Sequence, residues 1–379
     1  MPYCKLPTQG LTAHVLASSQ CMQLLRMYRP SVYLLALLVA ASSRPPLDNA
    51  TAAVFLDPAQ LSTTNTTIHL YYLPITWEGN HPEDAYQSLQ CDVPCSYAGG
   101  LEAEIMLQAD AVLFHLPMYS SGPDAITQHI GISRRLYTVA ISMEPSGFYP
   151  SQFDNVSSFD FEMSFRISSD IPTVYFGFWM DLLAPLSDHP WENREPAIVF
   201  LASHCASNSG REKLVQMLQE HVRVDSLSNC MNNHDWPTGI DRSDKLSLLR
   251  GYMVYLAAEN NVEPDYVSEK VYDGLIAGAV PIYLGAPNIN HFVPKNSVIS
   301  IPRNFTSADV AQVVEVVKKI FADKREYEKW TSFKQQPYSD DFMRRFNFTH
   351  TDPKCRLCRR IFADRYGYEW NKEKQTFGH

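Results

Sequence analysis

The 379-residue sequence lacks an excess of basic residues, because 32 Lys and Arg stand against 41 Asp and Glu and give a formal net charge of −9. Proteins that hold a nucleic-acid backbone present a basic patch or stripe, since contacts to phosphate supply most of the non-specific affinity. The composition therefore excludes a nucleic acid as the expected partner. Any anionic ligand has to be met by a few cations placed locally.

The sequence also lacks a run of about 20 apolar residues, which a membrane-spanning helix requires. Its main N-terminal apolar segment is VYLLALLVAA, and basic residues precede it. We expect a cytosolic segment over residues 1–30, a signal-anchor over 31–43 and a polar stem over 44–67, because positive charges favour the cytosolic side. A cleaved signal peptide is the alternative, since a short apolar core is typical of one. Both interpretations deliver the same body to the secretory lumen.

Cysteine is sparse, with eight residues, and two of them precede the apolar segment. The sequence holds six further cysteines and also five N-x-S/T sequons. The presence of both features indicates an oxidising, glycosylating compartment. The candidate glycosylation sites are Asn49, Asn65, Asn155, Asn304 and Asn347.

The six remaining cysteines suggest a disulfide framework. In chain order they are Cys91, Cys95, Cys205, Cys230, Cys355 and Cys358. Closing the first two and the last two on themselves would make tiny loops, whereas crossed bridges would close loops of roughly 260 residues and remove far more unfolded-state entropy. We therefore expect two crossed bridges, and a third bridge within the middle pair. A zinc half-site and a redox pair are the alternatives for C-x-x-C, but neither four soft ligands nor a thioredoxin-like setting is evident.

The most informative stretch, residues 251–285, reads GYMVYLAAENNVEPDYVSEKVYDGLIAGAVPIYLG. Its apolar runs over residues 252–258 and 280–284 predict buried strands, and the spacing between them predicts a helix. We expect Asp265 to cap this helix and Gly278 to end it. Ligands of such β-α-β units bind beyond the carboxyl ends of the strands. The polar side chains expected there are Glu259, Asn260, Glu269 and Lys270.

The succession AEN, a short acidic loop, DYVSEK and AGAVPIYLGAPNI resembles the donor-binding signature of the α1,3/α1,4 fucosyltransferases. The resemblance implies an inverting enzyme that moves L-fucose from GDP-β-L-fucose to a GlcNAc hydroxyl of a glycoprotein glycan. It also implies an α/β fold of GT-B type, with two Rossmann-like domains facing a deep cleft. We expect a single-pass type II protein of the Golgi membrane with a lumenal catalytic domain, because the basic residues precede the apolar segment. The C-x-V-P-C and C-R-L-C segments are similar to those of the plant and algal branch.

The alternation of apolar strands and helical segments predicts two α/β domains. We expect an acceptor-binding domain over residues 68–185, with strands in IHLYYL, ADAVLFHLP and RRLYTVAISME and a helix over 83–89. The GDP-fucose-binding domain is expected over residues 190–345, with an amphipathic helix over 308–321. The C-terminal segment, residues 346–379, carries C-R-L-C and then shows no clear period, so the sequence leaves its order open.

Glu144 stands at the carboxyl end of the predicted strand YTVAISM, before a Pro-Ser-Gly turn. The resemblance implies that a Glu at this place is the general base, which takes the acceptor proton as the hydroxyl attacks. A strand-terminal Glu that faces water is the alternative.

The resemblance places the donor in the second domain. Arg211 opens the predicted helix REKLVQMLQEH, which we expect Ser209 to cap, and both the helix N-terminus and the guanidinium suit a diphosphate. Lys270 is expected to supply the second positive charge, and Glu269 to bind a fucose or ribose hydroxyl. The remaining donor contacts are expected from Glu259, Asn260 and Tyr266. A solvated helix face is the alternative for the Glu269 and Lys270 pair.

The sequence has no D-x-D, the acidic pair with which metal-dependent glycosyltransferases hold Mn²⁺. Its nearest approach is Asp160-Phe161-Glu162, within an apolar run that predicts a strand. We therefore expect cations and helix dipoles to stabilise the leaving group. No cofactor or metal is required on this interpretation, which remains compatible with stimulation by Mn²⁺.

Two more functions stay open. One is a transferase of another nucleotide sugar on the same fold, and the second is an inactive, lectin-like protein of the lumen. The acceptor also stays open between the core GlcNAc of an N-glycan and an outer, Lewis-type GlcNAc. The expected partners are GDP-fucose, one of these glycans, and the membrane through the N-terminal anchor.

Overall fold

The computed structural model describes residues 67–73, 83–100, 103–119, 122–123, 136–175, 182, 190–348 and 351–378. The expected cytosolic segment, signal-anchor and nearly all of the stem lie outside these residues, as do Asn49 and Asn65. Within the described ranges, no helix combines the length and the apolar character needed to cross a membrane.

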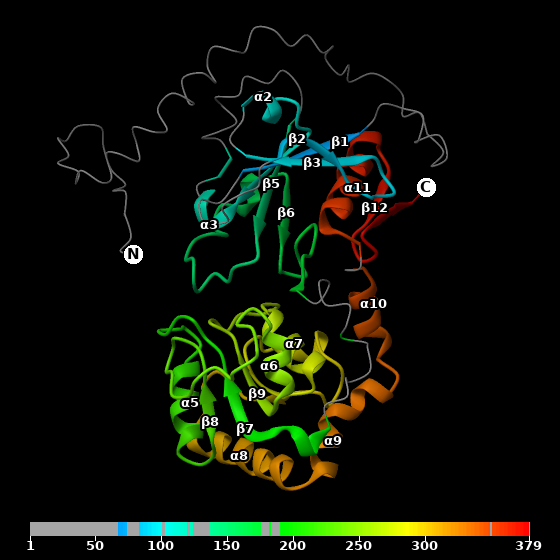
Figure 1. Cartoon of the computed structure of the whole chain (residues 1–379). Helices are drawn as coiled ribbons and strands as arrows, with labels where there is room; N and C mark the ends of the chain where they lie inside the picture. Colours follow the sequence, from blue (N-terminus) through cyan, green and yellow to red (C-terminus); the bar gives the residue numbers. More distant parts are fainter. Residues whose placement is uncertain are drawn as a thin grey trace, which may run out of the picture. The chain divides into compact units, whose positions relative to one another are not determined.

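Strands and helices alternate along much of the described chain, and most of the strands form two large sheets (Figure 1). The first sheet has six strands in the order β2-β3-β1-β4-β5-β6. Its strands are β1 (Ile68–Tyr72), β2 (Glu83–Ser88), β3 (Cys95–Gly99), β4 (Ala111–His115), β5 (Tyr137–Ser142) and β6 (Phe161–Ser164). All neighbours pair in parallel except β2, which is antiparallel to β3. Every residue of β4 is buried, as expected of a parallel strand covered on both faces.

The helix predicted over residues 83–89 is wrong, because this segment forms β2 at the edge of the first sheet. Its sequence, EDAYQS, carries neither a helical nor an alternating apolar pattern. Backbone pairing with β3 therefore decides its conformation, which local propensity does not predict.

Helices connect the strands of both sheets. The α-helices among the described residues are α2 (Ala103–Met106), α3 (Leu116–Tyr119), α5 (Arg211–Gln219), α6 (Lys245–Arg250), α7 (Glu269–Ala277), α8 (Ser307–Ala322), α9 (Lys324–Thr331), α10 (Asp340–Phe348) and α11 (Pro353–Tyr366). Short 3-10 helices are η2 (Val156–Ser158), η5 (Trp191–Asn193), η6 (Ile289–His291) and η7 (Ser332–Gln335). The helix predicted over residues 308–321 is confirmed as α8, which begins with a reciprocal capping box between Thr306 and Asp309.

The second sheet has five parallel strands in the order β11-β10-β9-β7-β8. They are β7 (Glu195–Phe200), β8 (Val224–Ser226), β9 (Tyr252–Ala258), β10 (Val280–Leu284) and β11 (Ile299–Ser300). All side chains of β9 are buried, and from Val254 to Ala258 they alternate between two cores. Tyr255 and Ala257 pack with α6 and α7, whereas Val254 and Leu256 pack with α5 and α8. Because successive side chains point to opposite faces of a strand, helices cover both faces of this sheet.

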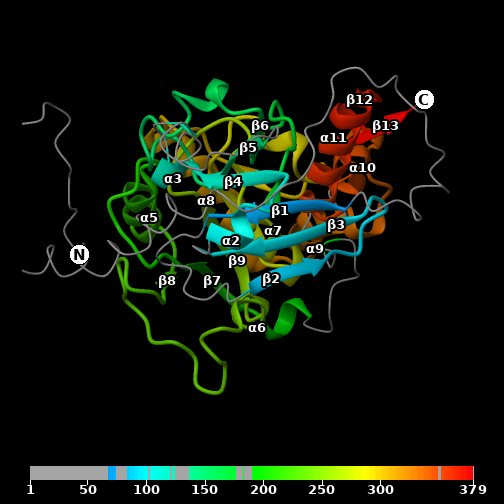
Figure 2. The same cartoon turned by 90° about the horizontal axis from the view of Figure 1, so that it is seen from above.

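The C-terminal segment returns to the first sheet. Leu357 and Ile361 of α11 are fully buried in one core with Ile68 and Val139 of that sheet. Figures 1 and 2 both draw α11 beside β1 and β3. An antiparallel hairpin follows, formed by β12 (Glu369–Asn371) and β13 (Thr376–Gly378). The segment whose order the sequence leaves open is thus a helix and a hairpin.

Three disulfides confirm the predicted framework. They are Cys91–Cys355, Cys95–Cys358 and Cys205–Cys230. The first two are the expected crossed bridges, with sequence separations of 264 and 263 residues. They link α11 covalently to β3 and to the loop that precedes it.

Candidate active site

The buried carboxylate of Glu259 fixes the start of α7. Glu259 directly follows β9 and is 0% exposed. Its oxygens accept hydrogen bonds from the backbone N–H of Ser268 at 2.8 Å and from Ser268 Oγ at 2.6 Å. A carboxylate that is removed from water needs such partners, because burial without them is costly. The first residue before α7 is therefore held against the carboxyl end of β9.

The prediction that Asp265 caps α7 is wrong, because the helix begins about one turn later in the chain. The N-cap is Ser268, whose Oγ accepts from the backbone N–H of Lys270 at 3.5 Å. Asp265 lies in the left-handed region with a φ of 67°. Its carboxylate accepts instead from the N–H of Ile167 at 3.1 Å and from Asn288 Nδ2 at 2.7 Å. Both oxygens are thus used outside the helix.

Lys270 lies between two carboxylates. Its Nζ is 3.3 Å from Glu259 Oε2 and 3.2 Å from Glu269 Oε1. Burial lowers the pKa of Lys270, but the two carboxylates outweigh burial, and the pKa lies above its ordinary value. Burial raises the pKa of Glu269, but Lys270 and then Lys245 outweigh it, and that pKa lies below its ordinary value. Lys270 and Glu269 are therefore both charged at neutral pH, and the cation expected to meet a diphosphate already has protein partners.

The backbone of Glu144 is anchored to buried polar groups just beyond the end of β5. Its N–H donates to Ser142 Oγ at 3.1 Å, and its carbonyl accepts from Gln152 Nε2 at 2.8 Å. Ser142 and Gln152 are buried and hydrogen-bond each other at 2.8 Å. Among the residues that the structure describes, none donates a hydrogen bond to the half-buried carboxylate of Glu144. The main chain is thus fixed, while the carboxylate remains available to a ligand.

The charges of Glu259, Glu269 and Lys270 change the pKa of Glu144. Burial is the largest influence and raises the pKa of Glu144 above its ordinary value. Lys270 acts in the opposite direction, whereas Glu269 and Glu259 add to the increase. The predicted base and the predicted donor-binding residues therefore share one electrostatic environment. A carboxylate with a raised pKa is a more effective base, because its pKa lies nearer the operating pH.

Tyr266, predicted to contact the donor, is only 3% exposed. Its ring packs edge-on against Phe165 and Tyr175, with centroid distances of 5.3 and 6.4 Å. Tyr175 OH donates to the carbonyl of Met143 at 2.8 Å. Burial and then the negative charge of Glu144 raise the pKa of Tyr175, so this phenol stays protonated. Tyr175 belongs beside the predicted base, although no motif marks it in the sequence.

Helix α5 begins at Arg211, as predicted, but its cap differs. The N-cap is Gly210, in the left-handed region with a φ of 80°, and not Ser209. Ser209 is buried, and its Oγ donates to the carbonyl of Glu259 at 2.6 Å. The loop before α5 is thus tied to the loop after β9, beside the start of α7.

The guanidinium of Arg211 is 5% exposed and holds protein partners. Its Nη2 donates to the carbonyl of His204 at 2.7 Å, and its Nη1 to that of Ala258 at 3.5 Å. Its Nε lies 3.5 Å from Glu212 Oε1 but makes no hydrogen bond. The fork expected to face a diphosphate therefore also braces the loop after β7 and the carboxyl end of β9.

Asn260 carries a buried amide oxygen that has no hydrogen-bond partner among the described residues. Its backbone carbonyl accepts from the N–H of Asn208 at 2.9 Å, so the main chain at this position is satisfied. Leaving a buried acceptor unpaired costs about 1–3 kcal/mol, which an N–H or O–H of a ligand would recover.

The described residues contain no group of three His, Cys, Asp or Glu side chains suited to a metal ion. Asp160 and Glu162, the nearest approach to an acidic pair, are engaged within the first sheet. Asp160 Oδ2 accepts from the N–H of Thr138 at 2.7 Å, and Glu162 Oε1 accepts from Ser164 Oγ at 2.6 Å.

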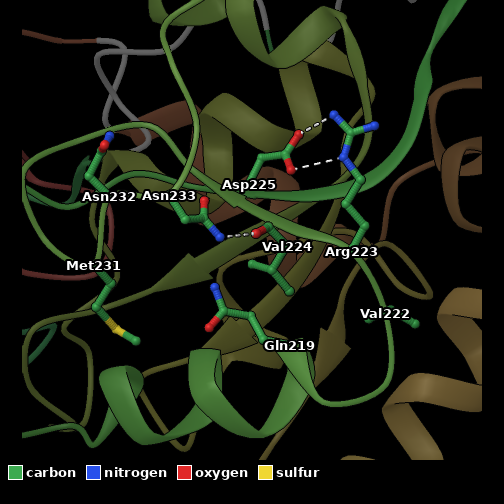
Figure 3. A pocket seen from close by; sticks show the side chains of 8 residues that line it. All are labelled: Gln219, Val222, Arg223, Val224, Asp225, Met231, Asn232 and Asn233. Carbon is green, nitrogen blue, oxygen red and sulfur yellow. Dashed lines mark hydrogen bonds and ion pairs between the residues drawn. The ribbon is translucent and has the colours of Figure 1, made fainter.

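A surface pocket of about 610 Å³ lies elsewhere, at the edge strand β8 and the C-terminal end of α5 (Figure 3). Its lining residues are Gln219, Val222, Arg223, Val224, Asp225, Met231, Asn232 and Asn233. Arg223 and Asp225 pair at 2.6 Å, and Asn233 Nδ2 donates to the carbonyl of Val224 at 2.8 Å. None of the predicted site residues lines this pocket, and Arg211 stands at the other end of α5.

Comparison with known proteins gives a family match over the second half of the chain. Residues 191–375 match the family described as glycosyltransferase family 10 (fucosyltransferase), C-terminal part. A fucosyltransferase-like protein of Arabidopsis thaliana is 32% identical over 269 residues, which cover 68% of this chain and 49% of that protein. An alpha-(1,3)-fucosyltransferase B of Drosophila melanogaster is 32% identical over 146 residues, 36% of this chain and 32% of that one. A GDP-fucose protein O-fucosyltransferase 3 of Danio rerio is 30% identical over 203 residues, 48% and 44% of the two chains.

The chain thus spans half or less of the length of these relatives. A crystal structure of an alpha1,3-fucosyltransferase with GDP matches at a TM-score of 0.53, with 13% identity, over 90% of this chain and 98% of that one. This likeness confirms the predicted α/β fold of GT-B type, with two Rossmann-like domains. The family match and the curated relatives together establish that the chain belongs to the fucosyltransferases of glycosyltransferase family 10.

Proposed function

We propose that this protein transfers L-fucose from GDP-β-L-fucose to a GlcNAc hydroxyl of a glycoprotein glycan, in an α1,3 or α1,4 linkage. Glu144 takes the proton of the acceptor hydroxyl, whose oxygen bonds to C1 of fucose while the bond from C1 to the β-phosphate oxygen breaks. Attack from the face opposite GDP inverts the configuration at C1.

One observation carries the proposal most strongly. Glu144 is a half-buried carboxylate with a raised pKa, and Lys270 and Glu269 of the family domain are among the charges that act on it. A base with that property, close to the predicted donor residues, suits proton removal from a hydroxyl.

On the donor side, Arg211 and Lys270 are expected to stabilise the charge that develops on GDP as it leaves. Both cations already hold protein partners, so the donor has to share them. Glu269 is expected to bind a fucose or ribose hydroxyl. The unpaired Oδ1 of Asn260 supports a contact with an N–H or O–H of the donor.

The acceptor admits a specific alternative, because one relative is named a GDP-fucose protein O-fucosyltransferase. A Ser or Thr hydroxyl of a protein would need the same base and the same donor. Transfer of a different nucleotide sugar and binding without turnover are the remaining candidate functions.

The first prediction concerns donor, acceptor and base together. The protein is incubated with GDP-fucose, GDP-mannose or UDP-GlcNAc and with GlcNAc-terminated glycans, core N-glycans and Ser/Thr peptides, and the linkage is determined by mass spectrometry. We expect fucosylated GlcNAc from GDP-fucose only, with substantial activity in EDTA. Glu144→Gln should lower the rate by roughly 10²- to 10⁴-fold while GDP binding is kept, since the amide cannot accept the proton.

The control is Glu192→Gln, which changes an exposed carboxylate paired with Lys324 and should leave the rate unchanged. Product from peptides alone would replace the proposed acceptor class. Complete loss of activity in EDTA, restored by Mn²⁺, would contradict the metal-free mechanism.

We also propose the Golgi membrane as the site of action, in the type II orientation with a lumenal catalytic body. The three disulfides support an oxidising compartment. Two sequons, at Asn155 and Asn304, are exposed, and Asn347 lies in α10. Protease protection in microsomes and a mass shift on glycosidase treatment test this placement.

A further inference from the structure

We propose that Glu263, in the segment between β9 and α7, is a positioning residue that holds the turn after Glu144 and so sets the base against the donor. The inference rests on the proposed function. It concerns the acidic residue of the short loop between AEN and DYVSEK, to which the resemblance assigns no role.

The carboxylate of Glu263 binds three donors at once. Its Oε2 accepts from the N–H of Ser146 at 2.7 Å, and its Oε1 accepts from Ser146 Oγ at 2.9 Å. Arg166 Nη2 lies 3.3 Å from the same Oε1 and forms an ion pair with it. The Arg166 guanidinium stacks on the ring of Phe153, at 3.5 Å from the centroid, which limits its freedom. The side chain of Glu263 is 16% exposed, so these charge-assisted bonds are only partly weakened by water.

Ser146 follows Glu144 by two residues. The contact between Ser146 and Glu263 therefore restrains the backbone next to the base. Ser142 Oγ accepts from the N–H of Glu144, and Gln152 Nε2 donates to its carbonyl. On its carboxyl side, the chain turns at once, because the N–H groups of Phe148 and Tyr149 both bond the carbonyl of Pro145. Glu263 holds the first residue inside that turn and thereby completes the support of Glu144.

The same turn has a second attachment, so loss of Glu263 alone need not unfold it. Asn208 Nδ2 donates to the carbonyl of Gly147. A Cβ atom on Gly147 would lie 2.2 Å from Asn261 Oδ1, which shows how closely the turn approaches the loop after β9. Removal of the Glu263 carboxylate should therefore loosen the position of Glu144 within an intact fold.

The second prediction tests this role with Glu263→Ala and Glu263→Gln. A displacement of about 1 Å at a catalytic group can lower a rate by about 100-fold. We expect Glu263→Ala to lower kcat by roughly 10- to 100-fold with an unchanged Kd for GDP. Glu263→Gln should fall between it and the wild type, because the amide keeps one acceptor for Ser146. Hydrogen exchange at the Ser146 amide should accelerate in Glu263→Ala.

The matched control is Asp309→Ala. Asp309 Oδ2 accepts from the N–H and the Oγ1 of Thr306, each at 2.7 Å, in the capping box of α8. Both variants remove one bond from a backbone N–H and one from a hydroxyl, beside Glu144 or in an exposed cap, and Glu263→Ala also removes the ion pair with Arg166. Asp309→Ala should lower Tm without changing kcat.

The outcomes separate the claims. Unchanged exchange at Ser146 in Glu263→Ala would overturn the contact itself. Faster exchange with an unchanged kcat, or an equal loss of kcat in Asp309→Ala, would overturn the positioning role alone. Failure of the wild-type protein to transfer fucose from GDP-fucose would overturn the proposed function and, with it, the role of Glu263 in setting a base, whatever Ser146 does.

Discussion

Glu144 illustrates what one residue's sequence context predicts and what it leaves out. Its place after an apolar strand and before a Pro-Ser-Gly turn is readable in the sequence, and the structure puts it just beyond β5. Its raised pKa is not readable, because burial and charges more than a hundred residues away in the chain produce it. The same holds for the two cations. The sequence predicts Arg211 and Lys270 as donor-binding residues, but it does not predict the carbonyl and the carboxylates that bind them in the structure.

The third prediction is the pH dependence of transfer. A general base acts in its ionised form, so kcat should fall tenfold per pH unit below the pKa of Glu144. Because burial raises that pKa, the acid limb should lie above the ordinary value of 4.5. Lys270 lowers the pKa of Glu144 and Glu269 raises it. Lys270→Met should therefore move the limb to higher pH, and Glu269→Gln to lower pH.

The measurement is kcat against pH at saturating donor for the wild type and both variants, with the Glu192→Gln protein as control. Limbs that coincide in all four proteins would show that Glu144 does not control the profile. Shifts in the opposite directions would contradict the assigned charges.

At the scale of elements, continuous apolar runs predict the buried strands correctly, whereas the polar sequence of an edge strand does not predict its conformation. The buried strands β9 and β10 match the predicted residues 252–258 and 280–284, because each is a continuous apolar run. Strand β2 is not predictable in this way, since only its pairing with β3 defines it. The predicted start of α7 is misplaced because Asp265 and Ser268 are both good capping residues. Contacts from distant residues decide between them, as Asp265 binds Ile167 and Ser268 binds Glu259.

The fourth prediction uses the predicted end of α7, which is confirmed. Gly278 is the C-cap, in the left-handed region with a φ of 73°. A side chain in that conformation is strained by about 1–2 kcal/mol, and Asn tolerates it better than Ala. Gly278→Ala should therefore lower the free energy of unfolding by about that amount, and Gly278→Asn by less. Urea unfolding with an unchanged m-value is the measurement, and equal losses in the two variants would contradict the conformational explanation.

At the scale of the whole molecule, the α/β class, the crossed disulfides and the C-terminal return to the first domain could all be predicted. The α11 helix and its hairpin could not, because the apolar residues of α11 serve two cores, with Leu357 and Ile361 in one and Phe362 in the other, and arginines lie between them. Its remaining surface is rich in arginine, so its sequence shows little helical periodicity. Tertiary packing, rather than a local pattern, accounts for its order.

The fifth prediction concerns the two long-range bridges. With one of them intact, the other closes only a small ring, so replacing Cys95 and Cys358 by Ser should cost about 2.5 kcal/mol of unfolding free energy. Replacing the other bridge as well opens a loop of 264 residues and should cost roughly 5.5 kcal/mol more. Denaturant unfolding of the single- and double-bridge variants measures both steps.

The control is the bridge Cys205–Cys230, which closes a loop of 25 residues inside the long one and should cost about 3.5 kcal/mol with or without the long-range pair. Equal, additive losses for the two long-range bridges would show that they do not constrain the same loop.

The crossed bridges also set the order in which a newly made chain can mature. At about 5–20 residues per second, the ribosome needs roughly 15–50 s to proceed from Cys91 to Cys355, 264 residues later. Until then, the native partners of Cys91 and Cys95 have not been made, and the first sheet lacks Leu357, Cys358 and Ile361 of α11 in its core. The second sheet depends on no such late arrival for its central β-α-β unit. The part of the protein that is synthesised first is therefore completed last.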